Sequence, residues 1–156
     1  MVPRCARRRP HVRYKTITQT VEIRGLKVTP FEVEHPQGAV GYRIDGPSSG
    51  VAIVTDHESG SARDAAIVEA IRGVEVLIYD GRYLPEEVDD HRGWGHSTWE
   101  DAVSVAAAVG VDRLILTSLD PRRTDDAVDA VDAVVHAARK KFHATEAAYP
   151  GLSVPL

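Results

Sequence analysis

The stretch His91-Arg-Gly-Trp-Gly-His-Ser-Thr-Trp-Glu-Asp-Ala102 is the most informative part of the sequence. Two glycines free the backbone just before His96, and Ser97 can cap a helix together with Glu100 three residues later. A histidine fixed at this point has one edge free for a phosphate or for an attacking water molecule. The positive field of the helix N-terminus favours an anion beside it. The stretch therefore predicts a functional histidine directly before a helix.

The residue pattern around this stretch predicts an α/β fold. Alternating apolar and polar residues predict strands at 20–24, 26–33, 39–45 and 51–55, with a tight turn at Gly25. The later part alternates between strands and helices: a helix from Ser61 to about Ile71, a strand over 74–79, the helix after Ser97, a strand over 114–117, and a last helix capped by Thr124. This order predicts a mixed sheet with helices on one face, whose other face needs a second layer.

The length and composition are those of one domain. The chain has 156 residues, enough for one core and too few for two ordinary ones. We expect a basic, disordered tail over 1–16, the domain over 17–145 and an irregular tail over 146–156. Cys5 is the single cysteine, which excludes an internal disulfide and a cysteine-based zinc site and favours a cytoplasmic protein. The apolar runs are too short to span a bilayer, so no membrane partner is expected.

The charge is divided unevenly along the chain. Residues 1–15 hold six of the 19 Lys and Arg residues and no acid, whereas the whole chain has 23 Asp and Glu residues. The remainder is therefore acidic, which argues against nucleic acid as a partner bound through bulk electrostatics. The basic tail is interpreted as a solvated segment.

Polar residues stand at the ends of three predicted strands. His35 follows the second strand, Asp56 the fourth and Asp80 the fifth, and His96 joins them as a second imidazole. Imidazole and carboxylate are the ligands that zinc or manganese accepts at a hydrolytic centre. Each residue alone also has a structural explanation: a turn cap for His35, a loop acceptor for Asp56 and a solvated loop position for Asp80. Their occurrence at successive strand ends favours a site.

Other polar and aromatic residues have weaker signals. His57 is expected to face solvent, because adjacent residues leaving a strand point to opposite sides. Trp94 could form the wall of a pocket beside His96, and Trp99 could do the same or lie in the core. Arg122 and Arg123 could bind a phosphate, or their loop could serve only to form a turn before Thr124.

Several segments resemble metallo-β-lactamase-fold hydrolases, in the branch that contains RNase Z and bacterial phosphodiesterases. The resemblance spans roughly residues 20–142 and keeps the motif order. The segments that carry it are Val33-Glu-His-Pro-Gln-Gly-Ala-Val-Gly-Tyr-Arg-Ile, Ala52-Ile-Val-Thr-Asp-His-Glu, Tyr83-Leu-Pro-Glu-Glu, Gly93-Trp-Gly-His-Ser-Thr-Trp-Glu-Asp-Ala and Leu114-Ile-Leu-Thr-Ser-Leu-Asp-Pro. The resemblance implies an αββα sandwich, here truncated on the N-terminal side so that only the C-terminal half is present.

The resemblance also implies roles for individual residues. His35 matches a histidine of the first metal, Asp56 the carboxylate that bridges two metals, and His96 the histidine that assists phosphodiester cleavage. From its position at a strand end, we expect Asp80 to be a second catalytic residue beside His96. The family's His-x-His-x-Asp-His cluster is absent from this sequence, and Ser118 stands where the last metal histidine is expected. Since a zinc centre needs three or four protein ligands, we expect no dinuclear centre and little or no hydrolase activity from this chain alone.

Two function classes follow. The first is a metal-dependent, phosphodiesterase-like hydrolase that uses zinc or manganese and acts on a phosphodiester or another small molecule. The second is a non-catalytic remnant or interaction module. In either case an isolated half would expose an apolar sheet face, so we expect a homodimer or pairing with a separate N-terminal half.

Overall fold

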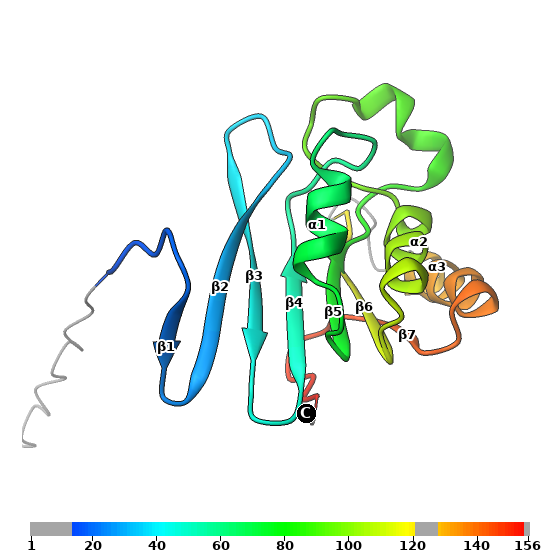
Figure 1. The fold of residues 1–156 in the computed structure, drawn as a ribbon. Coiled ribbons are helices and arrows are strands. Elements are labelled where there is room, and N and C mark those ends of the chain that lie inside the picture. The colour runs from blue at the N-terminus through cyan, green and yellow to red at the C-terminus, as the bar shows by residue number, and fades with distance from the viewer. Residues whose placement is uncertain (1–13, 121–127, 155–156) are drawn as a thin grey trace, which may run out of the picture.

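A single mixed sheet organises the molecule (Figure 1). The computed structural model describes residues 14–120 and 128–154. Its strands lie side by side in sequence order: β1 (Val21–Ile23), β2 (Leu26–Val33), β3 (Ala39–Asp45), β4 (Gly50–Val54), β5 (Val76–Asp80), β6 (Arg113–Thr117) and β7 (Thr145–Ala147). Its helices are α1 (Asp64–Ala70), α2 (Trp99–Val109) and α3 (Val128–Lys141), with short 3-10 turns η1 (Pro85–Glu87) and η2 (Asp89–His91). The predicted α/β fold is confirmed: four strands come first, and strands and helices alternate after them.

The strand directions bring several strand ends to one edge of the sheet. Strands β1 to β4 pair antiparallel, whereas β4 to β7 pair parallel. Strands β2, β4, β5 and β6 therefore all point the same way, and their carboxyl ends meet at the upper edge in Figure 1. The segments that follow these ends begin at Glu34, Thr55, Gly81 and Ser118. The residues predicted to form a site all lie in or beside these segments.

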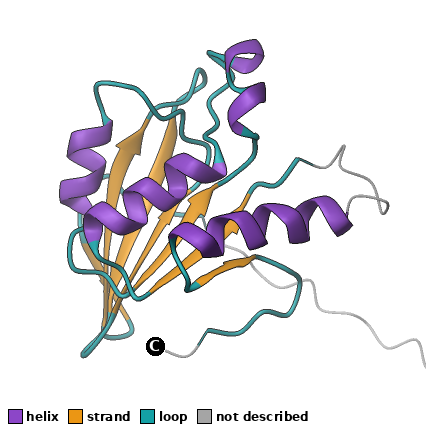
Figure 2. Cartoon of the chain, turned by 90° about the vertical axis from the view of Figure 1, so that its right-hand side faces the viewer, coloured by secondary structure: helices purple, strands orange, loops and turns teal. Residues whose placement is uncertain are grey.

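The helices cover one face of the sheet (Figure 2). Alternate strand residues such as Ala52, Leu77 and Leu114 share one buried cluster with Ile67 of α1, Ala106 of α2 and Ala138 of α3. The sequence left Trp99 either in the core or in the wall of a pocket. The structure places it in the core cluster. The core therefore lies between the sheet and the helices.

The opposite face of the sheet carries apolar side chains and no helix in the described part of the chain. Since Ala52 and Val54 face the helices, the alternation places Val51 and Ile53 on the other side. Cross-strand pairing adds Tyr42, opposite Ile53, to the same side. These three side chains are half-buried, and the segment after β7 passes behind the lower ends of the parallel strands in Figure 1. None of the described helices is long and apolar enough to cross a membrane.

The start of α1 differs from the prediction. The helix begins at Asp64 rather than at Ser61, because the Asp64 carboxylate accepts hydrogen bonds from the N–H groups of Gly60 and Ser61 and from the Ser61 hydroxyl. These contacts hold Ser61 in a turn before the helix. At the C-terminal end of α1, Arg43 of β3 donates to the carbonyl oxygens of Ala70 and Arg72. These carbonyl groups have no hydrogen-bond donor within the helix, and Arg43 supplies one.

The cap of α2 is one residue later than predicted. Thr98 is the N-cap, and it forms a reciprocal capping box with Asp101 rather than with Glu100. Ser97 is not free to cap the helix because its hydroxyl donates to the carbonyl oxygen of His57 at 2.6 Å. Gly110 ends the helix in a left-handed conformation, as expected.

The C-terminal part contains one strand that the sequence did not predict. Residues 146–156 were expected to be an irregular tail, yet Thr145–Ala147 forms β7 and pairs parallel with β6. The strand has only three residues, too few to show an alternating pattern. The predicted cap at Thr124 and the candidate phosphate contacts at Arg122 and Arg123 fall outside the described residues, as does most of the segment 1–16.

Candidate metal centre

Three potential metal ligands meet at the carboxyl edge of the sheet. Each of His35, Asp56 and His96 offers one ligand atom, and these atoms all lie within 4.8 Å of one another. His35 follows β2, Asp56 follows β4, and His96 precedes α2. The Asp56 side chain is half exposed, whereas only 14 % of the His96 side chain is exposed. The structure thus brings together the two predicted metal ligands and one of the two predicted catalytic residues.

Asp80, the other predicted catalytic residue, holds His96 from behind. Its Oδ2 lies 2.7 Å from Nδ1 of His96. A carboxylate only accepts hydrogen bonds, so this contact places the proton on Nδ1 and leaves the lone pair of Nε2 on the opposite edge of the ring. Metal-binding and catalytic histidines are commonly oriented in this way by a carboxylate.

Asp80 also connects the loops of the site. Its carboxylate accepts hydrogen bonds from the backbone N–H groups of Asp56 at 3.0 Å, Arg82 at 3.2 Å and Ser97 at 3.4 Å. The side chain is completely buried, so the alternative of a solvated loop position is wrong. A buried carboxylate is stable where charged or backbone donors surround it, as they do here.

Asp56 and Ser118 both leave their strands in an unusual backbone conformation. Their φ angles are +53° and +58°, in the left-handed region that residues with a Cβ seldom adopt. At Asp56 the conformation is held by the hydrogen bond from its N–H to Asp80. Such local strain is often found at functional sites.

Gly95 allows the His96 loop to approach His35. A Cβ at this position would lie 2.1 Å from Cδ2 of His35, and the φ angle is +84°. Glycine is therefore required both by the close contact and by the backbone conformation.

Glu58 fixes the same loop, although no sequence pattern pointed to Glu58 as a functional residue. One carboxylate oxygen accepts from the N–H of Gly93 at 2.8 Å, and the other accepts from the N–H of Gly95 at 2.9 Å. The N–H of Glu58 itself donates to the carbonyl oxygen of Glu34. Glu58 thereby links the segments that carry His35, Asp56 and His96. Its position two residues after Asp56 is the only signal that the sequence contained.

The prediction that His57 faces solvent is wrong. Its side chain is completely buried, and Nδ1 accepts a hydrogen bond from the N–H of Glu34 at 3.1 Å. Its Nε2 lies 3.4 Å from the Asp64 carboxylate without good hydrogen-bond alignment. Burial lowers the pKa of His57 below its ordinary value, although Asp64 opposes this shift. The side chains of His57 and Asp56 do point to opposite sides, as expected, but the His57 side chain is the one that points into the protein.

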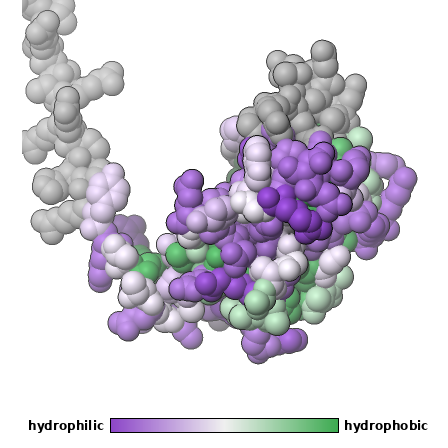
Figure 3. All heavy atoms as spheres, turned by 90° about the horizontal axis from the view of Figure 1, so that it is seen from above, coloured by the Kyte–Doolittle hydropathy of each residue, from purple (hydrophilic) through white to green (hydrophobic). Residues whose placement is uncertain are grey.

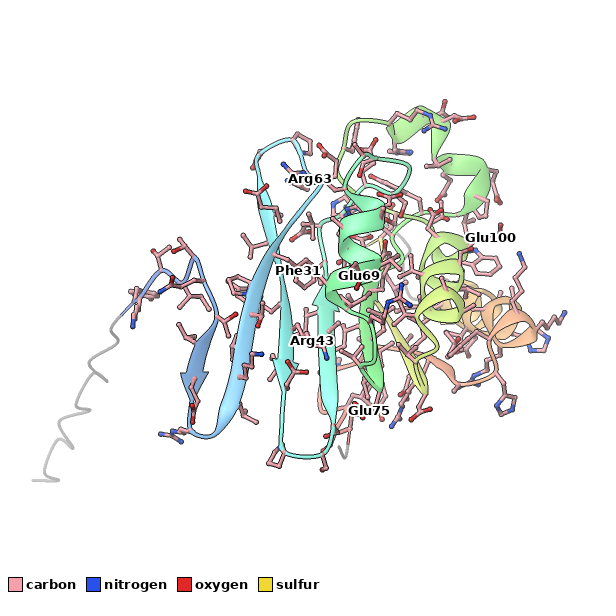
Figure 4. All side chains as sticks on the ribbon, in the orientation of Figure 1. Phe31, Arg43, Arg63, Glu69, Glu75 and Glu100 are labelled. Carbon is pink, nitrogen blue, oxygen red and sulfur yellow. The ribbon has the colours of Figure 1, made fainter. Side chains whose placement is uncertain are left out.

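Hydroxyl groups extend this buried support. Ser59 lies within hydrogen-bond distance of both Ser97, at 2.9 Å, and Tyr79, at 3.2 Å. Burial raises the pKa of Tyr79 above its ordinary value, so the phenol stays protonated and can donate. An ion pair supports the edge of the site: Arg63 of the segment before α1 reaches the end of β2 (Figure 4), where it pairs with Glu32 and Glu34.

The donor set fits one divalent cation. Two imidazoles and one carboxylate correspond to a site with three protein ligands and an open position for water or substrate. Among the described residues, His35, Asp56 and His96 are the His, Cys, Asp or Glu side chains that lie close enough together to hold a metal ion as a group of three. Ser118 offers a hydroxyl, which is a poor zinc ligand beside an imidazole. The arrangement therefore fits one cation better than two.

The surroundings of the centre are mostly hydrophilic. Figure 3, which views the molecule from above, shows hydrophilic residues over most of this end and hydrophobic residues in smaller patches. A separate cavity of about 730 Å³ lies at the other end of the strands, between Glu75, Arg113 and Arg139. There Arg113 pairs with Glu146, and Arg139 donates to the carbonyl oxygen of Thr145. We assign the chemistry to the His/Asp cluster rather than to this cavity.

Comparison with known proteins identifies the family. The family model described as the beta-lactamase superfamily domain matches residues 2–117. The chain belongs to the β-lactamase superfamily. This confirms the resemblance seen in the sequence, and similar solved structures confirm the metallo-β-lactamase fold.

Three known proteins illustrate the similarity. Ribonuclease Z from Methanosarcina mazei is 34 % identical over 127 residues, which cover 78 % of this chain and 35 % of the relative. The metallo-β-lactamase fold protein YhfI from Bacillus subtilis superposes with a TM-score of 0.69 at 20 % identity, covering 86 % of this chain and 52 % of that one. Zn(2+)-bound PqqB from Methylobacterium extorquens gives 0.65 at 19 % identity, with coverages of 91 % and 55 %.

These comparisons bear on the length of the chain relative to its relatives and on its expected partners. The chain spans about a third of the length of the curated ribonuclease Z that it matches. The name of that relative conflicts with the expectation, drawn from net charge, that nucleic acid is not a partner. Net charge describes the whole surface, whereas a nuclease site is a local feature.

Proposed function

We propose that the protein is a metal-dependent phosphodiester hydrolase that uses one divalent cation, zinc or manganese, at the His35–Asp56–His96 cluster. The observation that supports this most directly is the convergence of the three ligand atoms within 4.8 Å. The similarity to ribonuclease Z supports a phosphodiester as the bond that is cleaved. When bound, the cation would activate water and stabilise charge on the phosphate.

The residues of the chain have distinct roles in this proposal. His35, Asp56 and His96 would hold the cation, and the half-exposed Asp56 side chain leaves the site open to substrate. His96 would bind the cation through Nε2, the ring nitrogen that faces away from Asp80. Asp80 accepts from Nδ1 at 2.7 Å, which keeps the ring in place and leaves Nε2 as the nitrogen available to the cation.

The first experiment measures hydrolysis of bis-p-nitrophenyl phosphate by the full chain with zinc or manganese. In contrast to the low activity expected from the sequence, we expect metal-dependent release of p-nitrophenol, because His96 joins the two ligands predicted there. We expect His96→Ala to abolish it. His136→Ala is the matched control, because His136 is exposed on α3. Activity that survives His96→Ala, or that is equally reduced by His136→Ala, would contradict the proposal.

A second substitution tests the role of Asp80. Asp80→Asn keeps the size of the side chain but weakens the acceptor that orients His96, so we expect cation affinity to fall by about 10- to 100-fold. Calorimetric titration with zinc measures this change. Asp112→Asn is the control, since Asp112 is exposed at the opposite end of the sheet. An unchanged cation affinity in Asp80→Asn would show that Asp80 does not position His96.

The second candidate function is a non-catalytic binding module. It is favoured by the small donor set and by Ser118 at the position where the resemblance implies a histidine. Calorimetric titration separates the two. One cation per chain together with phosphodiester hydrolysis supports the enzyme, whereas binding without hydrolysis supports the module. Two cations bound per chain would contradict the inference that the site holds one.

A further inference from the structure

Trp94 lies in the loop that carries His96, but it has no role in the function proposed above. It precedes His96 by two residues, and 58 % of its surface is exposed. An isolated exposed apolar residue is common on proteins. Trp94 is different in that its backbone and its ring are both held in place by neighbouring groups.

The backbone on each side of Trp94 is anchored. Glu58 accepts from the N–H of Gly93 at 2.8 Å and from that of Gly95 at 2.9 Å. The N–H of Trp94 donates to the carbonyl oxygen of His91 at 3.1 Å. The position of Trp94 is therefore fixed relative to Glu58, which also positions the loop of His96.

A series of rings supports the indole from the protein side. The His91 ring lies 5.0 Å from the Trp94 ring at nearly a right angle, and it stacks on Tyr83 at 4.4 Å. Nδ1 of His91 is fixed by the carbonyl oxygen of Glu87 at 2.8 Å. Tyr83 is buried, and its ring centre is 6.0 Å from that of His96. The series thus runs from the exposed indole to His96 of the candidate cation site.

We propose that Trp94 is a stacking platform for one nucleobase of the substrate, next to the phosphodiester held at the cation site. The phosphodiester linkages of nucleic acids lie close to planar bases, and every base can stack on an exposed aromatic face. A platform that is already rigid loses little conformational entropy when a ligand binds. This inference rests on the proposed function, because that function provides the phosphate subsite.

The charge of the same loop indicates how much of a nucleic acid it can accept. Glu86, Asp89 and Asp90 are exposed in η1 and η2, and Arg92 is paired with Asp89. An extended run of phosphates along this loop would meet repulsion. The surface therefore fits one base beside the scissile phosphate rather than a track along a polynucleotide.

Tryptophan fluorescence tests the proposal without requiring turnover. The chain has two tryptophans, and Trp99 is buried. We expect adenosine 5′-monophosphate, added to the zinc-loaded chain, to quench the exposed indole. The probe without a base, ribose 5-phosphate, should bind about 5- to 100-fold more weakly, as expected for the loss of one base stack.

Three variants make the outcome specific, and calorimetric titration measures their affinities and that for ribose 5-phosphate, because Trp94→Ala and Trp94→Phe remove the exposed indole. Trp94→Ala should bring the affinity for adenosine 5′-monophosphate down to that for ribose 5-phosphate, and Trp94→Phe should restore most of the difference. Trp99→Phe should leave the quenching unchanged. Equal affinities of the wild-type chain for the two probes, no binding of adenosine 5′-monophosphate, or full affinity in Trp94→Ala would each overturn the proposal.

The result is distinguishable from a failure of the proposed function. Quenching through Trp94 in a chain that does not hydrolyse bis-p-nitrophenyl phosphate would retain the base platform and reject the hydrolase. Hydrolysis of that compound, combined with equal binding of the two probes, would retain the hydrolase and reject the base platform.

Discussion

Gly95 is the residue of the site that tolerates the least change. Its φ angle is +84°, and an added Cβ would lie 2.1 Å from the His35 ring and 2.7 Å from Pro36. Gly93, in the same loop, has a similar φ of +82° but no heavy atom within 4 Å of an added Cβ. Both glycines donate their N–H to Glu58. The pair therefore separates the effect of backbone strain from the effect of contact with a metal ligand.

We predict that Gly95→Ala weakens cation binding by at least about tenfold, because His35 must move to admit the methyl group. Gly93→Ala should cost about 1–2 kcal/mol of folding stability from its left-handed backbone, with cation affinity within about twofold of wild type. Calorimetric titration with zinc and urea unfolding measure the two quantities. Equal loss of affinity in the two variants would show that the contact with His35 does not matter.

The positions of the four candidate residues in the fold could be predicted from sequence, but the contacts that support them could not. His35, Asp56, Asp80 and His96 are polar residues placed where apolar strands stop or a helix starts, which is a local pattern. The burial of His57 depends on the Glu34 N–H, and the role of Glu58 depends on a loop 35 and 37 residues away. Such contacts arise between segments, so no local pattern encodes them.

At the scale of elements, the start of α2 holds the loop that carries His96. The N–H of Tyr83 donates to the carbonyl oxygen of Ser97 at 3.1 Å, and the N–H of Trp99 donates to that of Tyr83 at 3.3 Å. These hydrogen bonds close the base of the loop between β5 and α2. The Thr98 cap fixes the first turn of the helix to which the loop is attached.

We predict that Thr98→Ala lowers the free energy of unfolding by about 1 kcal/mol, the usual effect of losing an N-cap. Ser104→Ala, on the exposed side of α2, should change it by less than about 0.5 kcal/mol. Urea unfolding followed by circular dichroism measures both. A Thr98→Ala variant as stable as Ser104→Ala would mean that another residue caps the helix.

The elements themselves were predicted to different degrees. Strands β2 and β3 stand out because their residues alternate over a long stretch, and the turn before Leu26 follows from Gly25, whose φ is +81°. The cap of α2 was displaced by one residue because Ser97 and Thr98 are equally good caps in sequence, and only the contact with His57 decides between them. Strand β7 forms by pairing with β6, and its three residues do not signal this on their own.

At the scale of the whole molecule, the sheet has one face packed by helices and one apolar face that the described helices leave open. Tyr42, Ile53 and Ile78 are neighbours across three strands on that open face. The expectation that a second copy or a separate N-terminal half covers this face remains a prediction.

We predict that the chain dimerises and that Ile53→Glu shifts it toward the monomer, since a charge in a buried apolar contact is costly. Ala107→Glu on the exposed surface of α2 should leave the dimer intact. Multi-angle light scattering over a range of concentrations measures the state. A wild-type chain that is monomeric at every concentration, with no exposed apolar surface detected by a hydrophobic dye, would reject the prediction.

The directions of the strands have a thermodynamic consequence for the cluster at their ends. His35, Asp56 and His96 come from three separate segments and meet only when β2, β4 and β5 are aligned in the sheet. An unfolded chain offers no such meeting point, so a bound cation would select the native state. At free zinc a hundredfold above the dissociation constant, this linkage adds about 2.7 kcal/mol to the stability. Chelation would then lower the melting temperature, and thermal denaturation would report on occupancy of the cluster.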